Sequence, residues 1–100
     1  MLSLEQAREV AASTVCGRPE WLPPEDDLVI FDDSTIEKPW GWVFFWGSRM
    51  WQMTEDLKYA IAGNAPLLVE KQSGRVMVLV TARATEHYIE RYEKTGNPHG

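Results

Sequence analysis

Apolar residues along this chain gather in short runs, and the clearest pair of runs lies between positions 66 and 81. Residues 67–69 form the first run, and five consecutive apolar residues from Val76 to Val80 form the second. The polar break between them ends in Ser73-Gly74, where glycine tolerates the positive φ of a turn. The pattern predicts a β-hairpin. Because Val76–Val80 offers apolar side chains to both faces, we expect this second strand to lie inside a sheet.

Two more strands are predicted upstream of the hairpin. The first opens with the apolar run 28–31 and is expected to continue through polar residues as far as Glu37, with a bulge or a frayed end near Asp32-Asp33. The sequence Lys38-Pro39-Trp40-Gly41 is typical of a type I turn that joins antiparallel strands. The following strand, residues 42–46, is apolar on both faces, which predicts a central position. Its two faces consist of Trp42, Phe44 and Trp46 on one side and Val43 and Phe45 on the other.

Helical patterns mark both ends of the chain. Ser3 and Gln6 form a capping-box pattern, and apolar residues recur at helical spacing from Leu4 to Val15. A second helix is expected over residues 85–94, with Thr85 as its N-cap and Gly96 as its stop. Its predicted buried face consists of Tyr88, Ile89 and Tyr92.

These elements predict a single α+β domain over residues 1–100, with frayed ends at 1–3 and 96–100. The order α-β-β-β-β-α gives a four-stranded antiparallel sheet with the N- and C-terminal helices packed on one face. The segment 47–65 is the least regular, and there we expect either a short helix capped by Thr54 or irregular structure. A small sheet leaves edge strands, so a homodimer by edge pairing or helix packing stays open.

Charge changes the picture of what this domain binds. The net charge is −5, and the excess lies in the first half, which holds nine acids and four bases against six of each in the second. From Glu20 to Glu37 there are seven acids and no base. Such a surface repels nucleic acid and favours a cationic partner. No run approaches the length of a membrane span, and the single cysteine fits a reducing compartment, so we expect a cytoplasmic protein.

Catalytic chemistry finds little support in the sequence. There is no glycine-rich phosphate loop, nucleophile elbow or zinc signature. His87 is interpreted as a surface residue of the last helix, and Cys16 as a small apolar side chain at the end of the first. The acidic pairs Asp26-Asp27, Asp32-Asp33 and Glu55-Asp56 are read as solvated surface, with a small metal-dependent enzyme as a third hypothesis. We therefore predict no enzyme, no cofactor and no metal site.

Three stretches resemble the immunity protein 35 family, also called YrhB-like, in order and spacing from Gly41 to about Glu93. They are Gly41-Trp42-Val43-Phe44-Phe45, then Ala62-Gly63-Asn64-Ala65-Pro66-Leu67-Leu68-Val69-Glu70-Lys71 with the Ser73-Gly74 turn, and Thr81 followed by Glu86, Tyr88 and Tyr92. The resemblance implies a small bacterial protein that binds and neutralises the toxin of a polymorphic toxin or contact-dependent competition system. Chaperone-like behaviour has been linked to a YrhB-like member, which makes a holdase the alternative.

A binding surface is predicted where tryptophans and acids coincide. All five tryptophans fall within thirty-one residues, between Trp21 and Trp51. Trp42 is expected in the core, whereas tryptophans outside clear strands are candidates for binding anchors. The predicted anchors are Trp21, Trp40 and Trp51, and the predicted steering acids are Asp26, Asp27, Asp32, Asp33 and Glu37. Such a surface suits a toxin with a basic face.

Overall fold

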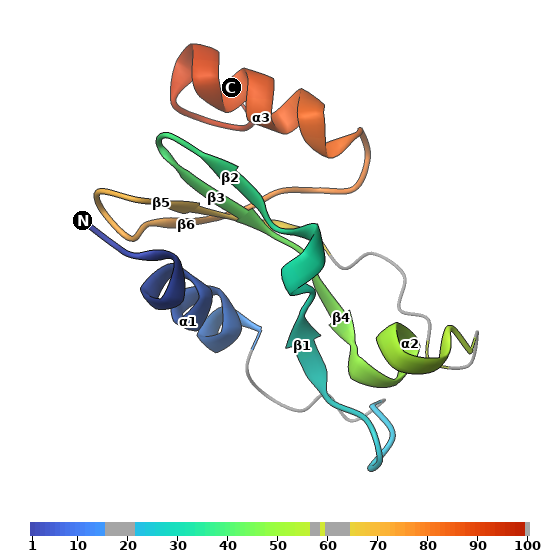
Figure 1. Ribbon diagram of the computed structural model, residues 1–100. Coiled ribbons are helices and arrows are strands. Elements are labelled where there is room, and N and C mark those ends of the chain that lie inside the picture. Colours follow the sequence, from blue (N-terminus) through green and yellow to red (C-terminus); the bar gives the residue numbers. More distant parts are fainter. Residues whose placement is uncertain (16–21, 57–58, 60–64, 100) are drawn as a thin grey trace.

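The computed structural model describes residues 1–15, 22–56, 59 and 65–99, and its centre is an antiparallel sheet (Figure 1). The four strands lie in the order β2-β3-β5-β6. Their bounds are β2 (Ile36–Lys38), β3 (Gly41–Phe44), β5 (Leu67–Glu70) and β6 (Val76–Val78). Two longer helices flank the sheet, α1 (Leu4–Thr14) and α3 (Thr85–Thr95). The predicted α+β class and four-stranded antiparallel sheet are confirmed.

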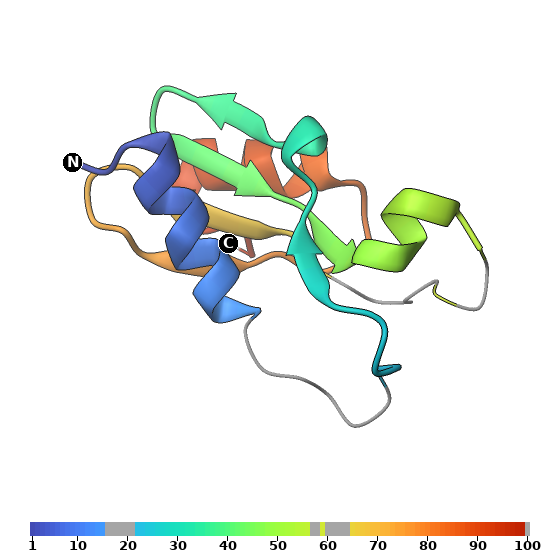
Figure 2. The ribbon, with the colours of Figure 1, turned by 60° about the horizontal axis from the view of Figure 1, so that its bottom comes forward.

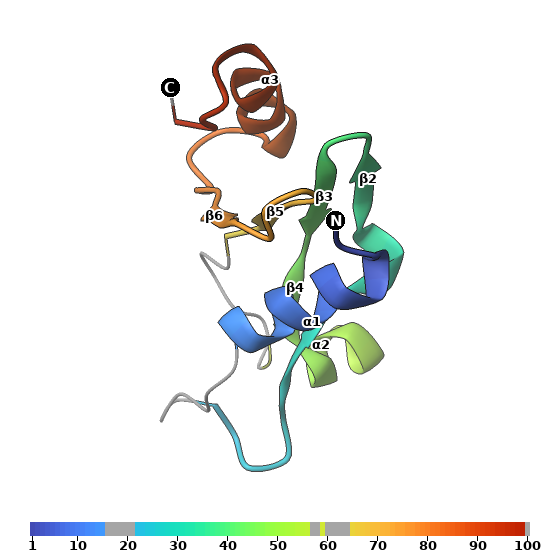
Figure 3. The same ribbon diagram turned by 90° about the vertical axis from the view of Figure 1, so that its left-hand side faces the viewer.

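The terminal helices cover opposite faces of this sheet, as Figures 1 and 3 show. α1 packs Ala7 and Ala11 against the face that carries Trp42, Phe44, Leu67 and Val69. α3 packs Tyr88 and Ile89 against the other face, which carries Val43, Leu68 and Met77. The expectation that both helices lie on one face is therefore wrong. Successive strand residues point to opposite faces, so the apolar runs of β3 and β5 need one helix on each side.

Both predicted upstream strands are interrupted. The first is divided into β1 (Leu28–Ile30), the 3-10 turn η1 (Asp32–Ser34) and β2, where a bulge or a frayed end was expected. The second breaks at Phe45, after which β4 (Trp46–Ser48) pairs with β1 in a separate two-stranded ribbon. A bond from the Phe31 amide to the Phe45 carbonyl, at 2.7 Å, joins the two breaks. Figure 2 shows this ribbon continuing beyond the four-stranded sheet toward the short helix α2 (Arg49–Thr54).

Strand β3 is central, as predicted, but β6 is not. β6 forms an edge of the sheet, and among the described residues no strand pairs with its outer side. Val78 and Val80 are 52% and 45% exposed. The chain leaves β6 for α3 without adding another strand, so the predicted interior position of 76–80 is wrong.

The helix ends follow the predicted signals only in part. Ser3 and Gln6 form both bonds of the capping box, at 2.9 and 3.2 Å. α3 begins after Ala84, which replaces the expected Thr85 as N-cap, and Gly96 ends it at φ 77°. Thr54 ends α2 where it was expected to begin a helix, and Ser48 is the N-cap of α2. Cys16, Gly17, Pro19, Gly63 and Asn64 lie outside the described residues.

Residues near both ends of the chain are bound to the sheet. The Leu2 amide donates to the Lys71 carbonyl at 2.8 Å, which ties the start of α1 to the hairpin. Pro98 is buried, and the ring of His99 lies 5.6 Å from that of Tyr88 between centroids. Pro98 and His99 thus contact the domain, and the expected fraying of 96–100 stays a prediction. No helix in the described part of the chain is long and apolar enough to cross a membrane.

Candidate partner-binding surface

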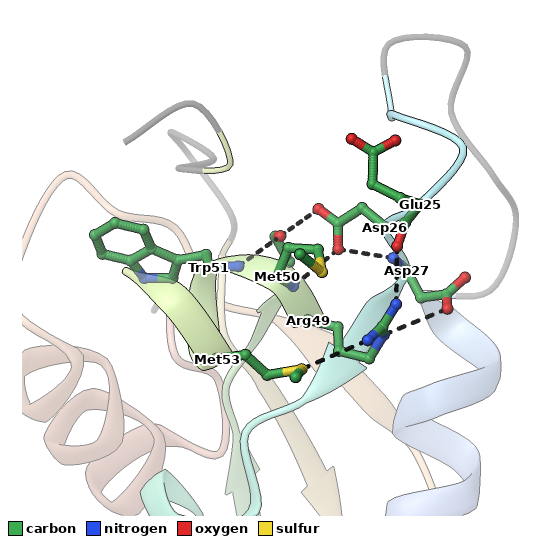
Figure 4. Close-up of polar contacts among 8 residues, drawn as sticks. Glu25, Asp26, Asp27, Arg49, Met50, Trp51 and Met53 are labelled. Carbon is green, nitrogen blue, oxygen red and sulfur yellow. Dashed lines mark hydrogen bonds and ion pairs between the residues drawn. The ribbon is translucent and has the colours of Figure 1, made fainter. Parts of the chain in front are cut away.

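Asp26 is the most buried acid of the predicted site, with 1% of the residue exposed. One carboxylate oxygen accepts from the amides of Asp27 and Met50, at 2.8 and 3.0 Å. The other accepts from the hydroxyl of Ser48, which in turn accepts from the Trp51 amide at 3.0 Å. Figure 4 shows this network at the start of α2. Asp26 therefore caps α2 together with Ser48, and its expected exposure is wrong.

Two opposing effects act on the pKa of Asp26. Burial raises the pKa, because it disfavours the charged form, whereas the hydrogen bonds from Ser48, Met50 and Asp27 and the nearby Arg49 lower it. The bonds prevail, and the pKa lies below its ordinary value. The carboxylate is therefore ionised and fully engaged at neutral pH.

Arg49 attaches the segment before β1 to α2. Its guanidinium donates to the Glu25 carbonyl at 2.8 Å and lies 3.5 Å from a carboxylate oxygen of Asp27 (Figure 4). The Asp27 side chain is 61% exposed, so this ion pair stabilises the fold weakly. The hydroxyl of Tyr59 donates to the Glu25 carboxylate at 3.1 Å. Predicted steering acids in this segment are thus partly neutralised or bound.

Asp32 holds η1 against α1. Arg8 donates to both of its carboxylate oxygens, at 2.6 and 3.0 Å. This side-chain hydrogen bond is the main reason why the pKa of Asp32 lies below its ordinary value. Asp32 remains on the surface, but Arg8 offsets much of its charge. Its neighbour Asp33 is exposed, and among the described residues it has no ion-pair partner.

A small hollow lies between η1 and α2. Its volume is about 200 Å³, and it is lined by Phe31, Ser34, Trp51, Gln52 and Glu55. Figure 4 shows the indole of Trp51 pointing away from the Asp26 network, on the side of α2 opposite Arg49. Glu55 closes α2 in a left-handed conformation, at φ 54°. We call these five residues together with Asp33 the η1–α2 surface; it combines two aromatic rings with two exposed carboxylates.

The other predicted anchors and acids lie elsewhere. Trp40 packs its ring 4.6 Å from that of Tyr92 and donates from its indole nitrogen to Glu93 at 3.0 Å, so it belongs to the α3 side of the sheet. Glu37 is on β2 and accepts from the indole nitrogen of Trp42 at 3.2 Å. Trp21 lies outside the described residues. Of the seven predicted residues that the structure describes, it brings Trp51 and Asp33 to the η1–α2 surface.

Sequence reasoning missed Phe31, Gln52 and Glu55 as surface partners of Trp51. Phe31 reads as the end of an apolar strand, and only the turn at η1 carries it toward α2. The one available signal was Ser48, an N-cap residue directly before a helical stretch. It was obscured because Trp51, three positions later, is not the Glu or Gln of a capping box.

Groups suited to metal chemistry do not assemble in the described part of the chain. Within those residues, no set of three or more His, Cys, Asp or Glu side chains lies close enough to hold a metal ion. His87 is an exposed residue of α3, as predicted, with its ring 5.3 Å from that of Tyr88. The arrangement that the structure does offer is a contact surface at η1 and α2.

Comparison with known proteins gives this surface a context. The uncharacterized protein YrhB of Escherichia coli (strain K12) is 40% identical over 53 residues, which are 53% of this chain and 56% of that protein. The matched part thus spans little more than half of this curated relative. No solved structure matches the chain. The family model of immunity protein 35 matches residues 6–94, nearly the whole chain, and this protein therefore belongs to the immunity protein 35 family.

Proposed function

We propose that this protein neutralises a cognate bacterial toxin by binding it stoichiometrically, with the η1–α2 surface as part of the contact. The observation that carries the proposal is membership of the immunity protein 35 family over residues 6–94. The protein acts without turnover and needs no cofactor. Its single cysteine fits a place in the reducing cytoplasm of the cell that it protects.

The η1–α2 surface supports this siting by its shape and chemistry. Phe31 and Trp51 provide aromatic side chains beside a hollow, the kind of feature in which binding hot spots concentrate. Asp33 and Glu55 add negative charge at its border, in a chain that carries a net charge of −5. Opposite charge on a partner accelerates association more than it strengthens the final complex. We therefore propose a toxin with a basic face.

Capture and kinetics together test the proposal. The tagged protein is used to isolate a partner from a lysate of its source, and the purified partner is then assayed for the activity that makes it toxic. Neutralisation by binding predicts that this activity falls linearly and vanishes at one protein per toxin. Activity that persists at a large excess of this protein would contradict the proposed function.

Charge reversal tests the siting. Asp33→Lys with Glu55→Lys should lower the association rate about tenfold at low salt and flatten its salt dependence. The matched control, Glu9→Lys with Glu86→Lys, makes the same change in net charge on α1 and α3 and should alter the rate less than about twofold. Equal association rates for the two double variants would show that the η1–α2 surface is not the site of toxin binding.

The holdase alternative lacks a supporting observation. A holdase needs a broad apolar patch. The exposed large apolar residues in the described part of the chain are distributed over the N-terminus, α1, α2, β6 and the segment that follows β6: Met1, Leu4, Met53, Val78 and Val80. Suppression of the aggregation of several unrelated proteins at equimolar concentration would return weight to this alternative.

A further inference from the structure

Strand β6 has the sequence of an interior strand but the position of an edge strand. Its run Val76–Val80 contains no polar residue, a pattern typical of strands with neighbours on both sides. Met77 and Leu79 are buried beneath α3, as the pattern requires. Val78 and Val80 remain 52% and 45% exposed. The pattern therefore indicates a neighbouring strand outside β6 that the described part of the chain does not supply.

The outer backbone of β6 is available for pairing. The Leu79 amide donates to the Pro66 carbonyl, and the Arg75 carbonyl accepts from the Glu70 amide, both at 2.9 Å. The backbone N–H and C=O groups of the odd-numbered residues are therefore directed toward β5. In an antiparallel ladder the alternate residues face away, which directs the amides and carbonyls of Val76, Val78 and Val80 outward. The Val78 carbonyl lies 3.0 Å from Nε2 of His99. An incoming strand would replace this one side-chain bond with backbone bonds.

The opposite edge of the sheet is protected in a way that β6 is not. β2 carries the charged residues Glu37 and Lys38 and is followed by Pro39. Charges and proline are the usual means by which edge strands avoid pairing with other chains. Because β2 is protected and β6 is apolar, the difference singles out β6 as the edge suited to recognition.

Charge identifies the kind of strand that fits. Arg75 directly precedes the 76–80 run and Arg83 follows it by three residues, and four of the six residues that line the cleft beside His99 are basic. These are Arg83, His87, Arg91 and His99. An antiparallel second copy paired symmetrically about Val78 would place the Arg75 of one chain opposite the Thr81 of the other, and residues 73–83 contain no acid that could pair with either arginine. We infer that the outer edge of β6 binds an extended segment of another protein, with alternating apolar residues and acidic ends.

A designed peptide tests this edge directly. The probe is the blocked heptapeptide Glu-Val-Thr-Val-Thr-Val-Glu, titrated into the ¹⁵N-labelled full chain. We expect the largest amide shifts, and new protection from hydrogen exchange, at Val76, Val78 and Val80. The same peptide with lysine at both ends should bind at least about fivefold more weakly at low salt, and this difference should shrink at high salt.

Two variants of one residue separate pairing from loss of the fold. Val78→Pro removes an outward amide without touching the bonds to β5, and Val78→Asn removes the exposed apolar side chain without adding a charge. Each should weaken binding of the acidic peptide about fivefold or more. Leu4→Lys, at a residue of similar exposure on α1, should leave binding unchanged. Thermal melting verifies that all three variants fold.

Several results would overturn the inference. Shifts centred on another element, equal binding of the acidic and basic peptides, or equal weakening by Leu4→Lys would each do so. If the chain binds neither peptide but forms a concentration-dependent dimer, and Val78→Pro abolishes that dimer, then the outer edge of β6 binds a second copy of this chain and the inference is wrong. Because this experiment uses no toxin, its failure leaves the proposed function standing.

Discussion

Replacing Asp26 separates a structural role from a role in partner binding. Asp26→Ala removes the acceptor of three hydrogen bonds and leaves the amides of Asp27 and Met50 and the Ser48 hydroxyl without it. Bonds to a charged acceptor contribute about 1.5–3 kcal/mol each, but they are not additive when they share one carboxylate. We expect Asp26→Ala to lower the free energy of unfolding by about 3–5 kcal/mol. Asp26→Asn keeps the shape but not the charge, so about 2 kcal/mol is expected.

Urea unfolding followed by tryptophan fluorescence measures both values. For a chain of 100 residues, 2 kcal/mol corresponds to a fall in melting temperature of roughly 8–16 °C. The control Asp27→Asn alters a carboxylate that is 61% exposed and should cost less than about 0.5 kcal/mol.

The pH dependence of Asp26→Asn has a definite sign. The pKa of Asp26 is lower in the folded protein than in the unfolded chain, where it is about 3.9. Its ionised form therefore stabilises the fold fully above that value, and the contribution disappears as the pH falls through the folded pKa. The difference between wild type and Asp26→Asn should be constant from pH 8 to 5 and shrink below about pH 4. An equal difference at pH 3 and pH 7, or a loss under about 0.5 kcal/mol at pH 7, would refute the reasoning.

Two further predictions concern the sheet and its contact with α3. A Cβ atom on Gly41 would lie 2.1 Å from the Val69 carbonyl oxygen on the neighbouring strand, so Gly41→Ala should cost about 3 kcal/mol or more in urea unfolding. Gly96→Ala, whose Cβ would meet nothing within 4 Å, should cost only about 1 kcal/mol, and equal costs would contradict the explanation. The Tyr92 hydroxyl donates to the Glu70 carboxylate at 2.6 Å, and this bond lowers the pKa of Glu70. Burial is the main reason, and the same bond the second reason, why the pKa of Tyr92 is raised to about 12. Tyr92→Phe should therefore lower the free energy of unfolding by about 1 kcal/mol at pH 7. This difference from wild type should decline in acid, where Glu70 is protonated, and again between about pH 10 and 12, where Tyr92 ionises.

Local signals in the sequence predicted the regular elements well. The alternation of Trp42 with Val43 located the two faces of β3, and Ser3 with Gln6 located the start of α1. Each of these signals depends on neighbours within four residues. The placement of the helices depends instead on which sheet face each one reaches, and the sequence pattern of α1 fits either face.

The candidate surface was harder to predict because side-chain partners are distant in sequence. Asp26 reads as one of several exposed acids, and only its bond to the Met50 amide, 24 positions away, shows that it is structural. Asp32 is offset by Arg8 over the same separation. Composition indicated that this part of the surface carries negative charge. Which acids remain unpaired there depends on these long-range bonds.

Coverage of both sheet faces affects how this protein can diversify. With one helix on each face, the interior is closed, and the η1–α2 surface lies at the rim of the fold. Asp33, Gln52 and Glu55 belong to neither core cluster. Substitutions at such exposed positions usually change stability by no more than about 0.5 kcal/mol. On the proposed function, single substitutions at these positions can therefore alter partner preference without producing variants that fail to fold.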